Sequence, residues 1–180
     1  MKSVTSWFKT ATLILCSVAY SYSQSNDDGL SAYIILSELG YKEIPKSLAI
    51  HSEVRRLRIS IDSGSWVILP PVSAWNRMID QAKENPLPSS ISSFTDLSFL
   101  DIAHLELTSL PKNFDLLQEL DSLNIAFNYL IIENELPKLK RLKKLRYLNL
   151  VGNRIDTLQV EQWIHENPLI HIEYRMDGWR

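Results

Sequence analysis

The four histidines are the residues of this chain best suited to metal binding or proton transfer, and their spacing argues against both roles. They stand at His51, His104, His165 and His171, without the H-E-x-x-H spacing that places two imidazoles on one helix face. Serine is frequent, but no G-x-S-x-G turn presents one as a nucleophile, and the sequence has no phosphate-cradling glycine loop and no C-x-x-C pair. We therefore expect no catalysis, no metal and no cofactor.

A basic stretch is the second candidate for chemistry. KLKRLKKLR, from Lys138 to Arg146, holds six cations in nine residues, and such a stretch attracts anionic glycans, lipid headgroups or nucleic acid. Leucines recur inside it at Leu139, Leu142 and Leu145, which favours the solvated outer side of a packed element. The formal net charge of −2 provides no basic surplus, so we expect no nucleic-acid partner.

Tryptophan side chains offer a third kind of site, because their rings can stack on sugars. Trp75 lies in an apolar stripe with helical spacing, formed by Val72, Trp75, Met78, Ile79 and Ala82, which favours a place in the core. The roles of Trp66, Trp163 and Trp179 stay open at this point, and so does a binding role for the segment around Trp66.

The N-terminus has the pattern of a secretory signal peptide. Residues 1–23 combine Lys2 and Lys9, a short apolar run over 11–19, and small residues before a cleavage point near Ser23. The run is too short to span a membrane. Leu15 precedes the single cysteine, Cys16, where a lipoprotein has a small residue, so lipid anchoring is not expected. We expect an exported protein, periplasmic or extracellular, whose mature chain has no disulfide.

The elements that must position any site follow a repeat. Seven apolar or proline residues between Leu87 and Ile102 return 23 residues later between Leu110 and Ile125. The same phase continues through Leu148 and Leu150 and, less regularly, through Ile34, Leu57 and Ile170. A fixed period of this length indicates a solenoid of stacked units.

The pattern LPxxIxxLxxLxxLxLxxNxL resembles a leucine-rich repeat of the 23-residue, bacterial secreted type. The resemblance implies an α/β fold: a right-handed βα superhelix with a short parallel concave sheet, here of about six strands. It covers regular repeats at about 34–59 and 87–172 within one domain, 24–180. Asn128 and Asn153 stand where the family places a turn asparagine. The last strand is expected to place Ile170 level with Leu148, and the first to place Ile34 level with Leu57.

Residues 60–86 interrupt the register. Leu57 and Leu100 are 43 residues apart, three short of two repeats. Two apolar runs flank the loop Asp62–Ser65 and predict a β-hairpin. The apolar stripe that begins at Val72 then predicts a helix, which Asn85 and Pro86 end. We read 60–86 as an irregular hairpin-helix insert.

The resemblance implies that ligands bind on the concave sheet. Residues facing outward there alternate with buried ones, and large aromatic side chains flanked by polar groups are typical of interface centres. The expected binding residues are Arg56, Arg58, Phe99, Asp101, Asn124, Tyr147, Asn149 and His171. The expected function is non-catalytic binding of a protein partner. A carbohydrate- or envelope-binding module and a structural subunit remain as alternatives, with an envelope glycan as a second candidate ligand.

Overall fold

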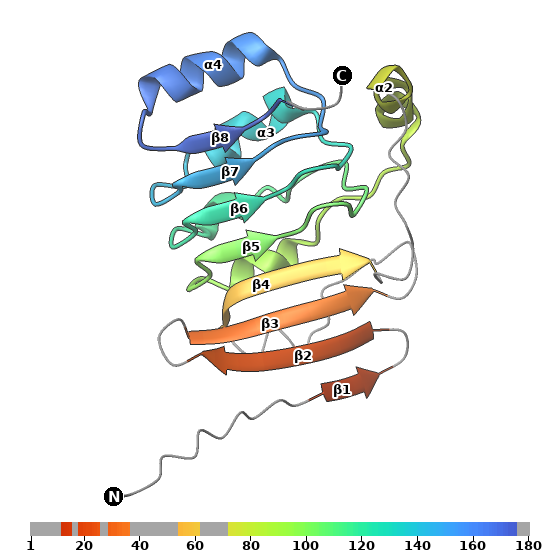
Figure 1. The fold of residues 1–180 in the computed structure, drawn as a ribbon, viewed down its shortest axis with the longest axis vertical. Helices are drawn as coiled ribbons and strands as arrows, with labels where there is room; N and C mark the ends of the chain where they lie inside the picture. The colour runs from red at the N-terminus through yellow and green to blue at the C-terminus, as the bar shows by residue number, and fades with distance from the viewer. Residues whose placement is uncertain (1–11, 16–17, 26–28, 37–53, 62–71, 176–180) are drawn as a thin grey trace, which may run out of the picture.

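The computed structural model describes residues 12–15, 18–25, 29–36, 54–61 and 72–175. Within these residues, eight strands form one sheet in chain order (Figure 1). The strands are β1 Thr12–Leu15, β2 Val18–Ser25, β3 Gly29–Leu36, β4 Val54–Ile61, β5 Phe99–Asp101, β6 Ser122–Asn124, β7 Tyr147–Asn149 and β8 His171–Glu173.

Strands β3 to β8 are parallel and each pairs with the next, while β1 and β2 add antiparallel ahead of β3. This confirms the predicted parallel sheet of about six strands. Figure 1 shows the strands stacked as successive rungs, with helix α2, Val72–Gln81, beside the C-terminal ends of the later ones. Consecutive strands are neighbours because each repeat can bury its apolar face only against the next repeat.

The register differs from the expectation at both ends of the sheet. Leu57 pairs with Leu100 as expected, but its partner in β3 is Ala32 rather than Ile34. Leu148 likewise pairs with Ile172 rather than Ile170. Both errors are slips of two residues. A slip of two keeps every side chain on its own face of the sheet, so the hydrophobic pattern cannot detect it.

Leucines of the repeat form a continuous core between the sheet and the outer segments. Leu57, Leu100, Leu123 and Leu148, which pair across β4 to β7, are each 0% exposed. Each buried side chain of this size contributes about 1.5–3 kcal/mol relative to its exposed state. The core therefore extends along the solenoid as one stack and continues through the units that lack a regular repeat sequence.

The outer side changes from short turns to helices along the chain. It begins with the 3₁₀ segments η1, Ser89–Ser93, and η2, Phe114–Leu116, and continues with helices α3, Ile132–Leu139, and α4, Thr157–Glu166. The unit between β6 and β7 has two residues more than its predecessor, and α3 lies within this longer unit. A longer unit has room for a full helical turn on the convex side.

Two asparagines, Asn128 and Asn153, close turns that follow the strands. Asn128 is 0% exposed, and its Oδ1 accepts the N–H groups of Leu105 and Leu107, each at 3.0 Å. Its Nδ2 donates to the carbonyls of Ile102 and Ile125, each at 2.9 Å. The turn around Leu105 has no asparagine of its own, and the asparagine of the next unit satisfies it.

Asn153 has the same role one unit later. Its Oδ1 accepts the N–H of Leu130 at 3.2 Å, and its Nδ2 donates to Ile125 and Leu150 at 2.9 and 3.0 Å. The turn role expected for Asn128 and Asn153 is confirmed. Each asparagine binds the backbone of the preceding unit as well as its own, so it fastens two units together.

The insert is described in part. Its predicted helix is confirmed as α2, while the hairpin loop and its second strand, 62–71, lie outside the described residues. Residues up to Ile61 belong to β4, which pairs with β3 and β5.

Strands β1 and most of β2 fall within the predicted signal peptide, whose cleavage stays a prediction. Cys16 lies outside the described residues. Removal of residues 1–23 would leave β3 at the edge of the sheet, because β2 pairs with β3 along its length.

Candidate binding face

Two rows of side chains cross the outward face of strands β4 to β8. The first row is Arg56, Phe99, Ser122, Tyr147 and His171, and the second is Arg58, Asp101, Asn124, Asn149 and Glu173. All eight residues predicted to bind a partner lie in these two rows. His171 lies in the first row, beside Tyr147, and not in the second row beside Asn149 as expected. Glu173 takes that place beside Asn149.

Two arginines dominate the N-terminal end of this face. The guanidinium of Arg56 lies 4.4 Å from the centroid of the Phe99 ring, a cation–π arrangement. Arg58 Nε lies 2.9 Å from Asp101 Oδ2, and the arginine side chain stays 54% exposed. Both guanidiniums are thus held in fixed positions while they keep surface for a partner.

An aromatic pair occupies the opposite end. The rings of Tyr147 and His171 stack with centroids 5.8 Å apart and planes 15° from parallel. His171 Nε2 lies 3.5 Å from Glu173 Oε1. Burial, followed by a hydrogen bond to Glu173, raises the pKa of the Tyr147 hydroxyl above its ordinary value, so this phenol remains neutral and able to donate at physiological pH.

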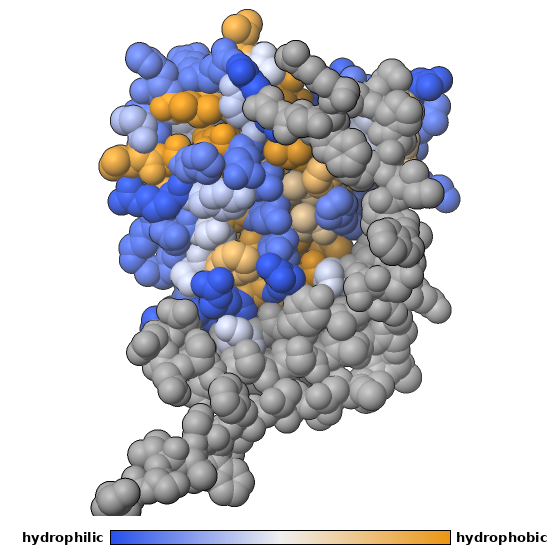
Figure 2. Space-filling model, in the orientation of Figure 1, coloured by the Kyte–Doolittle hydropathy of each residue, from blue (hydrophilic) through white to orange (hydrophobic). Residues whose placement is uncertain are grey.

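The middle of the face is a ladder of short polar side chains. Asp101, Asn124 and Asn149 each turn one oxygen back to the N–H two residues later, at 3.3, 3.2 and 3.0 Å. Such local bonds fix the side-chain rotamers. The Nδ2 of Asn124 has no hydrogen-bond partner among the described residues, which leaves a donor near the centre of the face. Figure 2 shows this face covered mainly by hydrophilic residues.

A second feature is the ridge of turns at the C-terminal ends of the strands. His104, Phe127 and Gly152 occupy the same position in three successive units, and all have positive φ, at 59°, 53° and 75°. The rings of His104 and Phe127 stack 4.5 Å apart. Burial lowers the pKa of the His104 imidazole below its ordinary value, although Asp101 acts in the opposite direction.

Helix α2 docks on this ridge through Trp75. The Trp75 indole lies edge-on to Phe127, with centroids 6.3 Å apart, and 5.6 Å from the ring of Tyr129. Its Nε1 donates to the carbonyl of Gly152. Arg154 joins the same contact through a 2.7 Å ion pair with Asp80. The insert thus spans the loops that follow β6 and β7, far from its own place in the sequence.

Gly152 is required at its position for two reasons. Its φ of 75° is disfavoured for side-chain-bearing residues, and an added Cβ would lie 2.5 Å from Cδ1 of Phe127. We expect Gly152→Ala to lower the free energy of unfolding by about 1–3 kcal/mol, measured by urea denaturation. Adding Phe127→Ala to the Gly152→Ala variant removes the clashing ring, so it should recover the part of the lost unfolding free energy that the clash causes. If Gly152→Ala matches the parent protein in stability, this account of the ridge is wrong.

The basic stretch has the structural role that its leucines indicated. Leu139, Leu142 and Leu145 are 0%, 3% and 2% exposed. Two of its cations pair with acids of the preceding unit, Arg141 with Asp115 at 3.0 Å and Lys144 with Glu119 at 2.5 Å. Lys140 lies over the ring of Trp163, which is only 2% exposed. Trp163 is therefore a core residue, and the leucines of the basic stretch attach it to the core while its cations lie on the outer surface.

Within the described part of the chain, no group of three or more His, Cys, Asp or Glu side chains is placed to hold a metal ion. Among the helices of those same residues, none has the length and apolar character needed to cross a membrane.

Sequence reasoning found the residues of the concave face but missed the ridge. Trp75 was expected in the core, and the structure leaves it only half-buried against Phe127 and Tyr129. Met78, in the same helical stripe, is also exposed, at 37%, so the stripe does not mark a fully buried helix face. No sequence signal links Trp75 to Gly152. Trp66 and Trp179 lie outside the described residues.

Comparisons with protein-family models and with curated proteins give no match. Among solved structures, the chain is similar to an LRR protein from Leptospira interrogans, with 20% identity and a TM-score of 0.46. That match covers 73% of this chain and 34% of the other, so this chain spans about a third of its length. The LRR ectodomain of the receptor kinase SOBIR1 from Arabidopsis thaliana matches at 18% identity and a TM-score of 0.43, covering 88% of this chain and 79% of the other.

The chain's own geometry determines the fold. Short parallel strands follow one another in chain order, one leucine ladder runs through them, and asparagines close the turns after the strands. This arrangement is a leucine-rich-repeat solenoid of α/β class.

Proposed function

We propose that this protein is a non-catalytic, exported scaffold that binds a protein partner on the outward face of strands β4 to β8. The observation that carries the proposal is the composition of the two rows on that face. A cation–π pair stands at one end and a stacked tyrosine–histidine pair at the other, with short polar residues between them.

This composition matches the chemistry of protein interfaces. Aromatic and arginine side chains are enriched at interface positions that contribute most to binding, and a polar surround is typical of such centres. The arginines and rings here are already held by neighbours, as Arg56 is by Phe99. Binding would therefore cost less side-chain entropy than it would on a surface of free side chains.

The test is affinity capture followed by a binding measurement. The mature chain, from Gln24, serves as bait for the proteins of the producer's envelope and medium, and the captured partner is purified. We expect Phe99→Ala/Tyr147→Ala to weaken its binding at least about tenfold, measured by calorimetry, while circular dichroism shows the parent fold.

The matched control is Leu116→Ala/Leu158→Ala. These leucines are 56% and 75% exposed and lie on η2 and α4, outside the two rows, so the same number of large side chains is removed from the other side. Equal binding by the parent and the Phe99/Tyr147 variant places the site elsewhere. Equal weakening by both double variants indicates a loss of fold and not of a site.

Export is part of the proposal and has its own support in residues 1–23. N-terminal sequencing of the secreted protein is the direct measurement, and a mature terminus at Gln24 is the expected result.

A further inference from the structure

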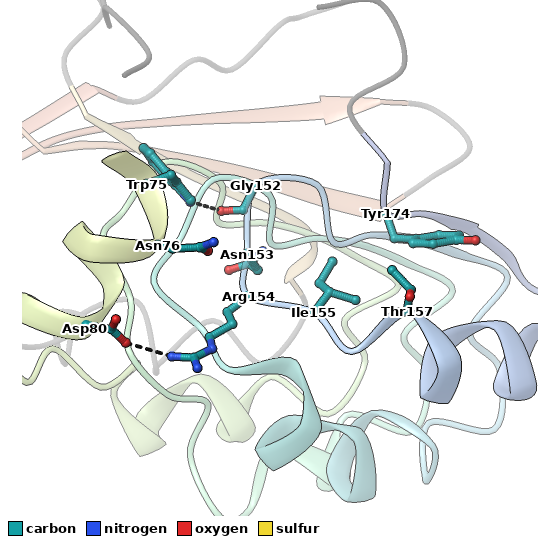
Figure 3. A pocket seen from close by; sticks show the side chains of 9 residues that line it. All are labelled: Trp75, Asn76, Asp80, Gly152, Asn153, Arg154, Ile155, Thr157 and Tyr174. Atoms are coloured by element: carbon teal, nitrogen blue, oxygen red, sulfur yellow. Dashed lines mark hydrogen bonds and ion pairs between the residues drawn. The ribbon is translucent and has the colours of Figure 1, made fainter. Parts of the chain in front are cut away.

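A cavity of ≈ 480 Å³ lies where helix α2 meets the loop after β7 (Figure 3). Trp75, Asn76 and Asp80 of α2 form one side. The backbone and side chains of Gly152–Ile155 form the floor, and Thr157 and Tyr174 close the far side. Small-molecule sites in proteins typically have volumes of about 300–1,000 Å³.

The walls of this cavity are held by specific contacts. Trp75 is fixed by its hydrogen bond to Gly152, and Arg154 and Asp80 pair at 2.7 Å across the gap between loop and helix. On the far side, the hydroxyl of Tyr174 donates to Glu161 at 3.1 Å. Because residues from three separate parts of the chain are tied in this way, the cavity is a defined element of the folded protein.

The charge of the lining favours an uncharged ligand. Among the described residues that line the cavity, only Asp80 and Arg154 are charged, and each neutralises the other. A phosphate or carboxylate ligand would meet a paired arginine and would have to compete with Asp80 for it. A purely apolar ligand would shield the Asp80–Arg154 pair from water and would offer it no hydrogen bonds in exchange.

The remaining lining combines apolar surfaces with hydrogen-bonding groups. Trp75, Tyr174 and Ile155 supply apolar surface, while Asn76 and Thr157 supply an amide and a hydroxyl. The amide of Asn76, on an exposed position of α2, has no hydrogen-bond partner within the described residues. A ligand that fits must be neutral, carry several hydroxyl groups and present apolar C–H faces to aromatic rings.

We propose that this cavity, which we call the α2 pocket, binds a neutral mono- or disaccharide. The sugar ring packs against Trp75 and Tyr174, and its hydroxyls bond to Asn76, Thr157 and the outer edges of the Asp80–Arg154 pair. The α2 pocket lies beside the ends of the strands and shares no residue with the two rows of the concave face, so the protein has separate sites for a glycan and for a protein.

The experiment uses the full mature chain and named probes. N,N′-diacetylchitobiose, cellobiose and maltose are titrated up to about 10 mM, with glucuronate and inorganic phosphate as charged comparators, and binding is followed by calorimetry and by tryptophan fluorescence. We expect at least one neutral saccharide to bind saturably and the two anions not to bind. Binding of the anions alone, or no binding by any neutral probe, overturns the proposal.

Variants locate the site. Tyr174→Ala and Asn76→Ala should each weaken saccharide binding at least about tenfold, which corresponds to about 1.4 kcal/mol. Arg77→Ala is the matched control, because Arg77 is an exposed neighbour on α2 that does not line the cavity, and it should bind as the parent does. Unchanged binding by both Tyr174→Ala and Asn76→Ala removes the site from this pocket. Phe99→Ala/Tyr147→Ala should keep saccharide binding, so this result is independent of the concave-face test.

Discussion

Replacing Glu135 with alanine is expected to lower the free energy of unfolding by about 3–5 kcal/mol. Glu135 is 3% exposed, and its Oε2 lies 2.5 Å from Lys138 Nζ and accepts the N–H of Leu110 at 3.1 Å. Lys138 in turn donates to the carbonyl of Leu110 at 2.7 Å. Alanine would leave a largely buried ammonium without its partner and a backbone N–H without its acceptor.

The control for this prediction is Glu119→Ala. Glu119 also pairs with a lysine, Lys144, at 2.5 Å, but both of these side chains are about half exposed. Exposed pairs of this kind contribute about 0–1 kcal/mol. Urea denaturation of both variants measures the difference, and similar losses for Glu119→Ala and Glu135→Ala would show that burial of the Glu135–Lys138 pair has no special role.

Replacing Asn128 with alanine should lower the free energy of unfolding by about 2–6 kcal/mol. The variant leaves the N–H groups of Leu105 and Leu107 unsatisfied in the core, and each such group costs about 1–3 kcal/mol. The carbonyls of Ile102 and Ile125 lose their donor as well. Because these four groups belong to two units, the loss should appear as a lower midpoint of one cooperative transition.

Two comparisons test the mechanism behind this value. Asn134→Ala removes an exposed asparagine from α3 and should change stability by less than about 0.5 kcal/mol. Asn128→Asp keeps the acceptor for Leu105 and Leu107, and its protonated carboxyl offers one O–H donor where the amide offers two N–H donors to Ile102 and Ile125. At a pH low enough to protonate that carboxyl, the stability of Asn128→Asp should fall between those of the parent and Asn128→Ala. A parent-like midpoint for Asn128→Ala contradicts the assigned role.

The sequence was sufficient for the fold and for most of the concave face, because both depend on periodicity. A leucine every 23 residues determines which strands are neighbours, and alternation then determines which residues face outward, as with Phe99 and Asp101. The register failed at β3 and β8 because a shift of two residues preserves that alternation. His171 was placed wrongly for this reason, and Glu173 was missed.

The ridge and the α2 pocket were beyond sequence reasoning for a different reason. They depend on contacts between residues far apart, such as Trp75 with Gly152 and Asp80 with Arg154, and no period connects an insert to the loop it docks on. Glu135 was missed as well, since it reads as an ordinary helix-surface acid until the backbone of Leu110 is seen to need both a donor and an acceptor.

The asparagine turns set the order in which parts of the solenoid can close during synthesis. Asn128 binds the backbone at Leu105 and Leu107, and Asn153 binds the backbone at Leu130, so each asparagine completes a turn in a unit that is synthesised before it. A ribosome releases the chain from its N-terminus, and each of these turns must therefore wait for the asparagine that lies more than twenty residues downstream. A nascent chain arrested just before Asn128 would expose an open turn at Leu105, and the next few residues to emerge would close it.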